Sequence, residues 1–287
     1  MTVDVVKYKF GIFGMGFLGS AITHGFGLHA DIKIYDKFLT GYDDINDVID
    51  HADFIWMCLP TPMDLDTGDI DLSILEENLE KINNRVSAED KKIVIIKSTV
   101  TPGTTRKFSE KYPKLNFIMN PEFLTARNNK LDFICASRII IGTDKFDIGD
   151  KLKEVYQYRF GSAVPIYVCE WEEAELTKYA SNCFFTVKVS YFNFLYSMCE
   201  KLGLKFDYVR DMVLADSRIA RSHASVPGWD GQRGYSGPCF PKDINALINF
   251  AKEIGVDPEL LESSWSQNLK DRPSKDWEKI PSAVSKK

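Results

Sequence analysis

Residues 234–243 (GYSGPCFPKD) place one cysteine, Cys239, among glycines and prolines, directly before a predicted helix start. A cysteine in this position has two interpretations. Most free cysteines are small core residues. A thiol at a helix N-terminus with a cation close by, here Lys242, ionises more readily and can act as a nucleophile. The residues around Cys239 leave both interpretations open.

A second pair of side chains that could take part in a reaction, Lys178 and Asn182, lies four residues apart in a long apolar stretch. On a helix this spacing places an ammonium and an amide on one face. Such a pair supplies a positive charge and a hydrogen-bond donor on the same face. In the alternative, the face is partly exposed and Lys178 extends its ammonium to water.

A third feature is the glycine pattern GMGFLG at residues 14–19, which follows a predicted strand and precedes a helix predicted at residues 20–26. In this context the pattern predicts a dinucleotide-binding loop. Gly14 allows the tight turn, Gly16 lets a pyrophosphate approach the backbone, and Gly19 lets helix and strand pack closely. Phe17 and Leu18 complete the loop. An ordinary strand-to-helix turn is the alternative.

Asp36, at the end of the second predicted strand, identifies the expected dinucleotide. A carboxylate there accepts hydrogen bonds from a ribose diol and repels a 2′-phosphate, which favours NAD over NADP. The neighbouring Lys37 weakens this preference and belongs to the same expected cofactor site.

The elements that must position these residues follow two patterns. Short β-branched runs alternate with helical stretches in the first half, which predicts a Rossmann-type doubly wound parallel sheet. The seven expected strands are residues 8–13, 32–35, 54–59, 93–97, 116–119, 138–141 and 165–168. Residues 170–202 then predict one long helix, apolar on nearly all sides and therefore buried nearly all round. Such a helix runs between domains or packs against a second subunit.

Composition excludes several classes of protein. The 287 residues carry a net charge of −5, which argues against nucleic-acid binding and against an anionic membrane surface. No apolar run is long enough for a membrane span, and the N-terminal MTVDVVKYKF lacks the apolar core of a signal peptide, so we expect a cytoplasmic protein. The six cysteines are scattered without a CxxC pair, so neither a metal site nor a disulfide framework is expected.

Seven ordered motifs together resemble the UDP-glucose/GDP-mannose dehydrogenase family: GIFGMGFLG, LPTPMD, KSTVTPGTT, NPEFL, AELTKYASN, ADSRI and GYSGPCFPKD. The resemblance implies an NAD-dependent oxidation of a nucleotide-sugar C6 alcohol to a carboxylate, through a thiohemiacetal and a thioester on cysteine. The expected substrate is UDP-glucose, with GDP-mannose or a UDP-N-acetylhexosamine as alternatives.

The resemblance also implies roles for individual residues. Cys239 is the nucleophile, Lys178 and Asn182 hold the C6 oxygen, Asp243 assists proton transfer, and Glu122 guides the hydrolytic water with help from Thr99. Further cofactor contacts are implied at Pro60, Thr61 and Thr99, and further substrate contacts at Phe123, Leu124, Arg218, Tyr235 and Gly237, with Arg218 reaching the neighbouring subunit.

The expected organisation is an NAD-binding domain (residues 1–169), an all-helical dimerisation domain (170–270) and a polar tail (271–287). Family members carry a third domain after a helix like residues 258–269, so we expect this chain to contain only two, with a substrate cleft that is open or completed by a partner chain. Where the family often has a carboxylate, this chain has Ala126. The loop of residues 226–234 either touches the nucleotide sugar or is a plain surface loop.

Two other functions stay open. The chain could be a NAD-binding interaction protein with little activity, although an intact set of catalytic residues argues against this. It could also be a β-hydroxyacid dehydrogenase, which combines a similar NAD domain with a helical domain. That reaction is a two-electron oxidation and needs neither Cys239 nor Glu122.

Overall fold

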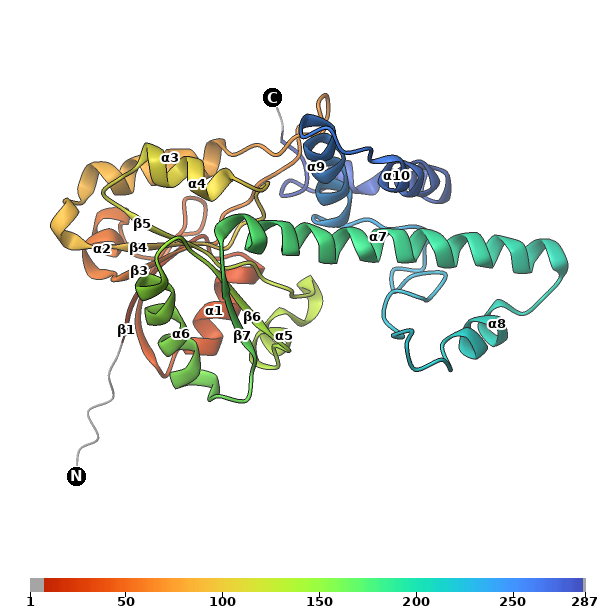
Figure 1. Cartoon of the computed structure of the whole chain (residues 1–287), viewed down its shortest axis with the longest axis horizontal. Helices are drawn as coiled ribbons and strands as arrows, with labels where there is room; N and C mark the ends of the chain where they lie inside the picture. The colour runs from red at the N-terminus through yellow and green to blue at the C-terminus, as the bar shows by residue number, and fades with distance from the viewer. Residues whose placement is uncertain (1–7, 286–287) are drawn as a thin grey trace. The chain divides into compact units, whose positions relative to one another are not determined.

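The computed structural model describes residues 8–285 (Figure 1). Residues 1–7, which include most of the segment examined for a signal peptide, lie outside the described part. Contacts divide the chain into two compact units. The first holds the residues up to Thr61 together with Leu72–Lys178, and the second holds Pro62–Asp71 together with the residues from Tyr179 onward. Within residues 8–285, no helix combines the length and apolar character needed to cross a membrane.

The first unit is built on a seven-stranded sheet in the order β2-β1-β3-β4-β5-β6-β7. The strands are β1 (Tyr8–Phe13), β2 (Ala30–Tyr35), β3 (Phe54–Met57), β4 (Ile93–Ile96), β5 (Asn116–Met119), β6 (Ile139–Gly142) and β7 (Ile166–Cys169). The seven expected strands and the doubly wound fold are confirmed. One detail was wrong, because β5 and β6 pair in an antiparallel sense at Met119 and Gly142. The sheet is therefore mostly rather than wholly parallel.

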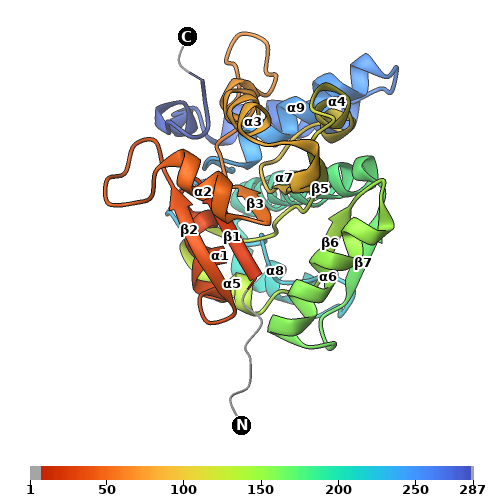
Figure 2. The ribbon, with the colours of Figure 1, turned by 90° about the vertical axis from the view of Figure 1, so that its left-hand side faces the viewer.

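Apolar residues on alternate positions of the central strands fill two cores, one on each face of the sheet. In β3, for example, Phe54 and Trp56 join one core, and Ile55 and Met57 join the other. This is the two-residue period of a strand buried on both faces. Helices cover both faces (Figure 2).

The helices α1 (Phe17–Phe26), α5 (Asn129–Ile134) and α6 (Phe146–Phe160) contribute to one core, and α2 (Ile45–His51), α3 (Ser73–Arg85) and α4 (Thr104–Lys111) to the other. Two short 3₁₀ turns lie between these elements, η1 (Ala88–Asp90) and η2 (Ala126–Asn128). The carboxyl ends of β1 and β3 meet the loops that carry the expected cofactor residues.

The expected long helix is confirmed as α7 (Trp171–Leu202), which begins in the first unit and continues into the second (Figure 1). The expectation of burial on nearly all sides was wrong for the single chain. One stripe of large apolar side chains is exposed: Leu176 47%, Phe184 63%, Tyr191 55%, Phe194 54%, Met198 44% and Leu202 64%. The apolar periodicity shows which faces of a helix are apolar, but it does not show whether the same chain or another molecule covers them.

The second unit adds α8 (Phe206–Val213), α9 (Phe240–Glu253), α10 (Glu259–Asp271) and the 3₁₀ turn η3 (Asp276–Lys279). It has two main apolar clusters, one around Phe192 and Phe206 and the other around Tyr235 and Ile244.

Residues after α10 do not form the solvated tail that their polar composition suggests. Trp277 is buried, and Val284 joins a small apolar cluster with Met63. The backbone N–H of Met63 donates to the carbonyl of Ala283 at 2.8 Å, and the N–H of Ser285 donates back to Met63 at 2.8 Å. The segment therefore pairs with the 62–71 loop, and this pairing holds both pieces in one unit.

Candidate functional site

The glycine loop between β1 and α1 has the geometry that a dinucleotide requires. Gly14 has a φ of +92°, and a Cβ there would lie 2.6 Å from the carbonyl oxygen of Cys58. A Cβ on Gly19 would lie 2.0 Å from the carbonyl oxygen of Gly14, so any side chain would push helix and loop apart. Both glycines thus serve the expected purposes.

Gly16 differs, because a Cβ on it would meet nothing within 4 Å. Gly16 is the N-cap of α1 and supplies no side chain to the N–H groups of the first turn. Open space beside unsatisfied N–H groups at a helix N-terminus suits an anionic pyrophosphate. The residues present therefore fit NAD at this loop.

Asp36 connects this loop to the end of β2. Its carboxylate accepts the N–H of Met15 at 2.7 Å, and also those of Phe38 at 2.9 Å and Leu39 at 3.1 Å. Lys37 is turned to an exposed ion pair with Glu77, 3.4 Å away. Asp36 thus shapes the glycine loop, a role that the sequence pattern did not reveal.

We expect Asp36→Ala to reduce the preference for NAD over NADP by about tenfold, because a charged acceptor for the ribose diol is lost. Calorimetric titration with each cofactor measures the change. Asp36→Asn is the control, since its amide oxygen still accepts the Met15 N–H while the charge that repels a 2′-phosphate is gone. Equal affinity of the unmodified protein for NAD and NADP would disprove the assignment.

The other expected cofactor residues lie where β3 and β4 end. Thr61 donates its hydroxyl to the carbonyl of Thr99 at 2.9 Å, and Ser98 donates to the carbonyl of Leu59 at 2.6 Å. Thr61 and Thr99 are buried, whereas Pro60 is exposed. These bonds tie the two strand ends together at the carboxyl edge of the sheet, where ligands of such folds bind.

Glu122 and Lys178 form a buried ion pair in the first unit. The Lys178 ammonium donates to the backbone carbonyl of Glu122 at 2.6 Å and to its Oε1 at 3.1 Å, and the side chains are only 4% and 8% exposed. The other carboxylate oxygen, Oε2, is buried without a hydrogen-bond partner. The interpretation in which Lys178 reaches water was wrong. A buried oxygen with spare acceptor capacity suits a group that must bind a water or a substrate.

Phe123 and Leu124 follow Glu122, and the Phe123 ring contacts this pair. The Phe123 ring lies 5.5 Å from the Lys178 ammonium and 4.0 Å from the Arg138 guanidinium. Two cations against one ring keep positive potential beside the ion pair. Leu124 packs instead against the neighbouring apolar core.

Sequence reasoning missed Lys97, a buried cation in the same region. Its ammonium donates to Asn120 Oδ1 at 3.0 Å, and the hydroxyl of Tyr156 donates to the same oxygen at 2.6 Å. Burial lowers the pKa of Lys97 to about 8, although attraction to Glu122 opposes this. Its position in KSTV, directly before residues already singled out, was the available signal.

A second missed residue, Glu175, lies three positions before Lys178 on α7. Its fully buried carboxylate accepts the backbone N–H of Gly103 at 2.6 Å and both the N–H and hydroxyl of Thr105, at 2.8 and 2.6 Å. Burial raises the pKa of Glu175 to about 7, although the hydrogen bonds from Thr105 and Gly103 lower it. The contacts cap the N-terminus of α4 and fix the first turns of α7, and so the position of Lys178.

In the second unit, Cys239 is the N-cap residue of α9 and is partly buried. One turn on, the fully buried Asp243 accepts the Asn182 amide at 2.6 Å and the Lys242 ammonium at 2.6 Å. Asn182, Lys242 and Asp243 therefore form one polar cluster beside the first turn that Cys239 opens. The predicted helix start is confirmed.

The remaining expected substrate residues have no hydrogen bond to Asn182, Lys242 or Asp243 among the contacts of the described residues. Arg218 is highly exposed and pairs with Asp216 at 2.5 Å. The Tyr235 side chain is only 4% exposed and packs in a core cluster of the unit. Gly237 has a φ of +87° and open space around it. Glu122 with Lys178, and Asn182 with Asp243 and Cys239, are thus two groups, one in each unit.

The fold and the glycine loop define the first unit as an NAD-binding domain. Residues 26–159 match the NAD binding domain of the UDP-glucose/GDP-mannose dehydrogenase family, and residues 172–270 match its central domain. The chain belongs to this family.

Relatives with curated names agree. The chain is 31% identical to the UDP-glucose 6-dehydrogenase TuaD of Bacillus subtilis over 247 residues, 84% of this chain and 51% of that protein. It is 30% identical to the UDP-glucose 6-dehydrogenase of Rickettsia bellii over 242 residues, 83% of this chain and 53% of that protein. The chain thus spans about half the length of these relatives.

Solved structures share the fold. A UDP-glucose dehydrogenase from Pyrobaculum islandicum matches with a TM-score of 0.83 and 24% identity, over 94% of this chain and 70% of that one. A 3-hydroxyisobutyrate dehydrogenase of Mycobacterium tuberculosis matches with a TM-score of 0.73 and 14% identity, over 94% and 95%.

Proposed function

We propose that the protein oxidises the C6 alcohol of a nucleotide sugar to a carboxylate, with UDP-glucose as substrate. The observation that carries the proposal is the arrangement around α9, where Cys239 opens the helix and Asp243 is held one turn later by Asn182 and Lys242. The buried Glu122–Lys178 pair supports it independently. Relatives named for UDP-glucose favour this substrate over GDP-mannose or a UDP-N-acetylhexosamine.

The overall reaction converts alcohol, two NAD⁺ and water into carboxylate, two NADH and three protons. Bound NAD supplies the hydride acceptor. In the first half, Lys178 and Asn182 hold the C6 oxygen while its proton is lost, and the cation stabilises the negative charge that develops there. Asp243 receives or relays that proton.

In the second half, the Cys239 thiolate adds to the aldehyde carbon and gives a tetrahedral thiohemiacetal, from which hydride can leave. The product of that step is a thioester. Glu122 then orients and deprotonates a water that attacks the thioester carbon, with Thr99 as a second contact, and the Cys239 thiolate leaves. The unpartnered Oε2 of Glu122 is the acceptor assigned to this water.

Counting cofactor per product tests the proposal. The protein is incubated with NAD and a panel of nucleotide sugars, and NADH and product are quantified together. Two NADH per carboxylate from one of these sugars is the expected result. One NADH per product would mean a two-electron oxidation that ends at the aldehyde, and would contradict the covalent route. No NADH with any sugar but NADH with a β-hydroxyacid would favour a hydroxyacid dehydrogenase, a class that shares this fold. No NADH with either class of compound would favour an NAD-binding interaction protein.

We also propose that the exposed apolar stripe of α7 forms a symmetric homodimer contact, because a stripe of this size is seldom left in water. Light scattering over a range of concentrations should show a dimer. Phe184→Asp should weaken the dimer at least about 30-fold, as loss of a central aromatic anchor does. Leu28→Asp, at a position that is 85% exposed in the first unit, is the control. A monomer at every concentration would contradict this contact.

A further inference from the structure

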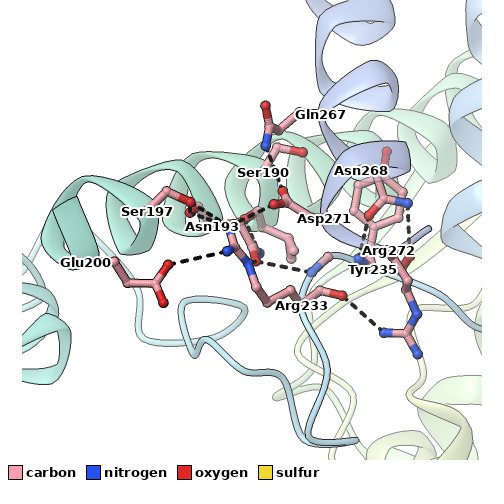
Figure 3. Close-up of polar contacts among 12 residues, drawn as sticks. Ser190, Asn193, Ser197, Glu200, Arg233, Tyr235, Gln267, Asn268, Asp271 and Arg272 are labelled. Carbon is pink, nitrogen blue, oxygen red and sulfur yellow. Dashed lines mark hydrogen bonds and ion pairs between the residues drawn. The ribbon is translucent and has the colours of Figure 1, made fainter. Parts of the chain in front are cut away.

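The backbone just before Cys239 is held by side chains from distant parts of the second unit (Figure 3). The N–H of Tyr235 donates to Asn268 Oδ1 at 2.7 Å, and the Asn268 amide donates back to the carbonyl of Tyr235 at 3.0 Å. Asn268 is 1% exposed. One amide side chain therefore satisfies both polar groups of one residue, as a paired strand would.

The residues on either side of Tyr235 are fixed as well. The N–H of Gly234 donates to Asn193 Oδ1 at 3.2 Å, and the Ser236 hydroxyl donates to Asp276 Oδ1 at 2.8 Å. Three successive residues are thus anchored to α7, α10 and η3. We call residues 234–236 the anchored segment.

Two arginines, the partly buried Arg233 and the buried Arg272, reinforce the anchors of this segment. Arg233 bonds Ser197 at 2.6 Å and Asp271 at 2.8 Å, which links α7 to α10. The Nε and Nη2 atoms of Arg272 donate to the two carboxylate oxygens of Asp276, at 2.7 Å each. Paired carboxylates surround both cations, so the anchors themselves are held firmly.

Gly234 and Asn268 are fitted to each other. Gly234 has a φ of +69°, and a Cβ there would lie 2.5 Å from Asn268 Oδ1. The glycine is therefore required both by the turn and by the amide that packs against it. Buried hydrogen bonds hold the backbone here, where apolar side chains could fill the same space. Such bonds specify one path of the backbone, which apolar packing does less strictly.

From these contacts we infer that Asn268, assisted by Asn193, is a positioning residue that fixes the orientation of Cys239. Only Gly237, with a φ of +87°, and Pro238 separate the anchored segment from this N-cap residue. A thiol at the N-terminus of a helix lies near the N–H groups of the first turn, which favour the thiolate. Released from its anchors, the thiol samples orientations away from those groups. The link to turnover rests on the proposed function, whereas the effect on the thiol does not.

The test compares Asn268→Ala with Ser190→Ala in the full chain. Ser190 and Ser264 form a buried hydroxyl pair at 3.0 Å between the same two helices, α7 and α10. Ser190→Ala therefore controls for weakened packing of these helices. Asn268→Asp is the second variant, because it keeps the acceptor for the Tyr235 N–H and replaces the donor by a charged carboxylate oxygen.

Three readouts are expected to change in Asn268→Ala and not in Ser190→Ala. Amide hydrogen exchange at Gly234 and Tyr235 should accelerate at least about tenfold. Alkylation of Cys239 by iodoacetamide at pH 7, followed by peptide mass spectrometry, should slow severalfold, with the exposed Cys135 unchanged as internal standard. The kcat should fall roughly tenfold to hundredfold with an unchanged KM for NAD. Asn268→Asp should lie between Asn268→Ala and the unmodified protein.

Unchanged exchange in Asn268→Ala would overturn the inference, and so would accelerated exchange with Cys239 alkylation like that of Ser190→Ala. If the unmodified protein forms no NADH with any nucleotide sugar, the proposed function fails, and the alkylation rates still decide whether Asn268 positions the thiol.

Discussion

Replacing Cys239 by serine is expected to lower steady-state turnover more than about 1000-fold while NAD affinity stays unchanged. Removal of hydride from the alcohol needs no covalent bond to the enzyme, but oxidation of the aldehyde does. A serine hydroxyl is a poorer nucleophile at neutral pH, and an ester transfers its acyl group to water more slowly than a thioester. NAD affinity is preserved because the glycine loop and Asp36 lie in the first unit.

The measurement is NADH formation under substrate saturation, with NAD binding by calorimetry on the same samples. Cys135→Ser is the matched control, since Cys135 is a free and exposed thiol far along the chain from α9. Turnover of Cys239→Ser equal to that of the unmodified protein would rule out the covalent route. The two-electron alternative would then be the better account.

Glu122→Gln is expected to stall the enzyme as the thioester, with a burst of about two NADH per site followed by turnover slowed about 100-fold. The glutamine keeps an oxygen where Oε1 receives the Lys178 ammonium, so the local geometry persists. It places an amide nitrogen at the position of the unpartnered Oε2. An uncharged amide cannot deprotonate water. Both oxidations remain possible, and hydrolysis alone is slowed.

Intact-protein mass spectrometry after mixing with NAD and substrate should show an adduct on Glu122→Gln. Hydroxylamine, which cleaves thioesters, should remove that adduct, and the double variant with Cys239→Ala should form none. A burst without an adduct on Cys239 would contradict the assignment of Glu122 to hydrolysis.

The elements of the sheet could be predicted because their signals are local. A β-branched run such as Ile93–Ile96 between polar turns has few alternatives, and GMGFLG needs only its own neighbours to specify a turn and a helix. The antiparallel pairing of β5 with β6 has no such local signal. The direction of β6 depends on the path of the connection between the two strands, and not on the residues of either strand.

Residues whose partners are distant along the chain could not be predicted. Glu175 resembles any helix-surface carboxylate until Gly103 and Thr105 are brought to it across 70 residues or more. Arg272 and Trp277 were counted as parts of a polar tail, yet both are buried. Asp230 and Asp276 neutralise the charge of Arg272, and the Trp277 ring packs against Trp265. Burial of a charge depends on its partners, which composition does not reveal.

The pairing of Met63 with residues 283–285 also sets an order of events during synthesis. Met63 and Ser285 are 222 residues apart, whereas every strand of the sheet lies within residues 8–169. Chains leave the ribosome at about 5 to 20 residues per second, so the 62–71 loop emerges roughly 10 to 45 s before the segment that pairs with it. The sheet can close around its own strands during that interval. The 62–71 loop between β3 and α3 is synthesised early, and it lacks its pairing partner until residues 283–285 have been synthesised.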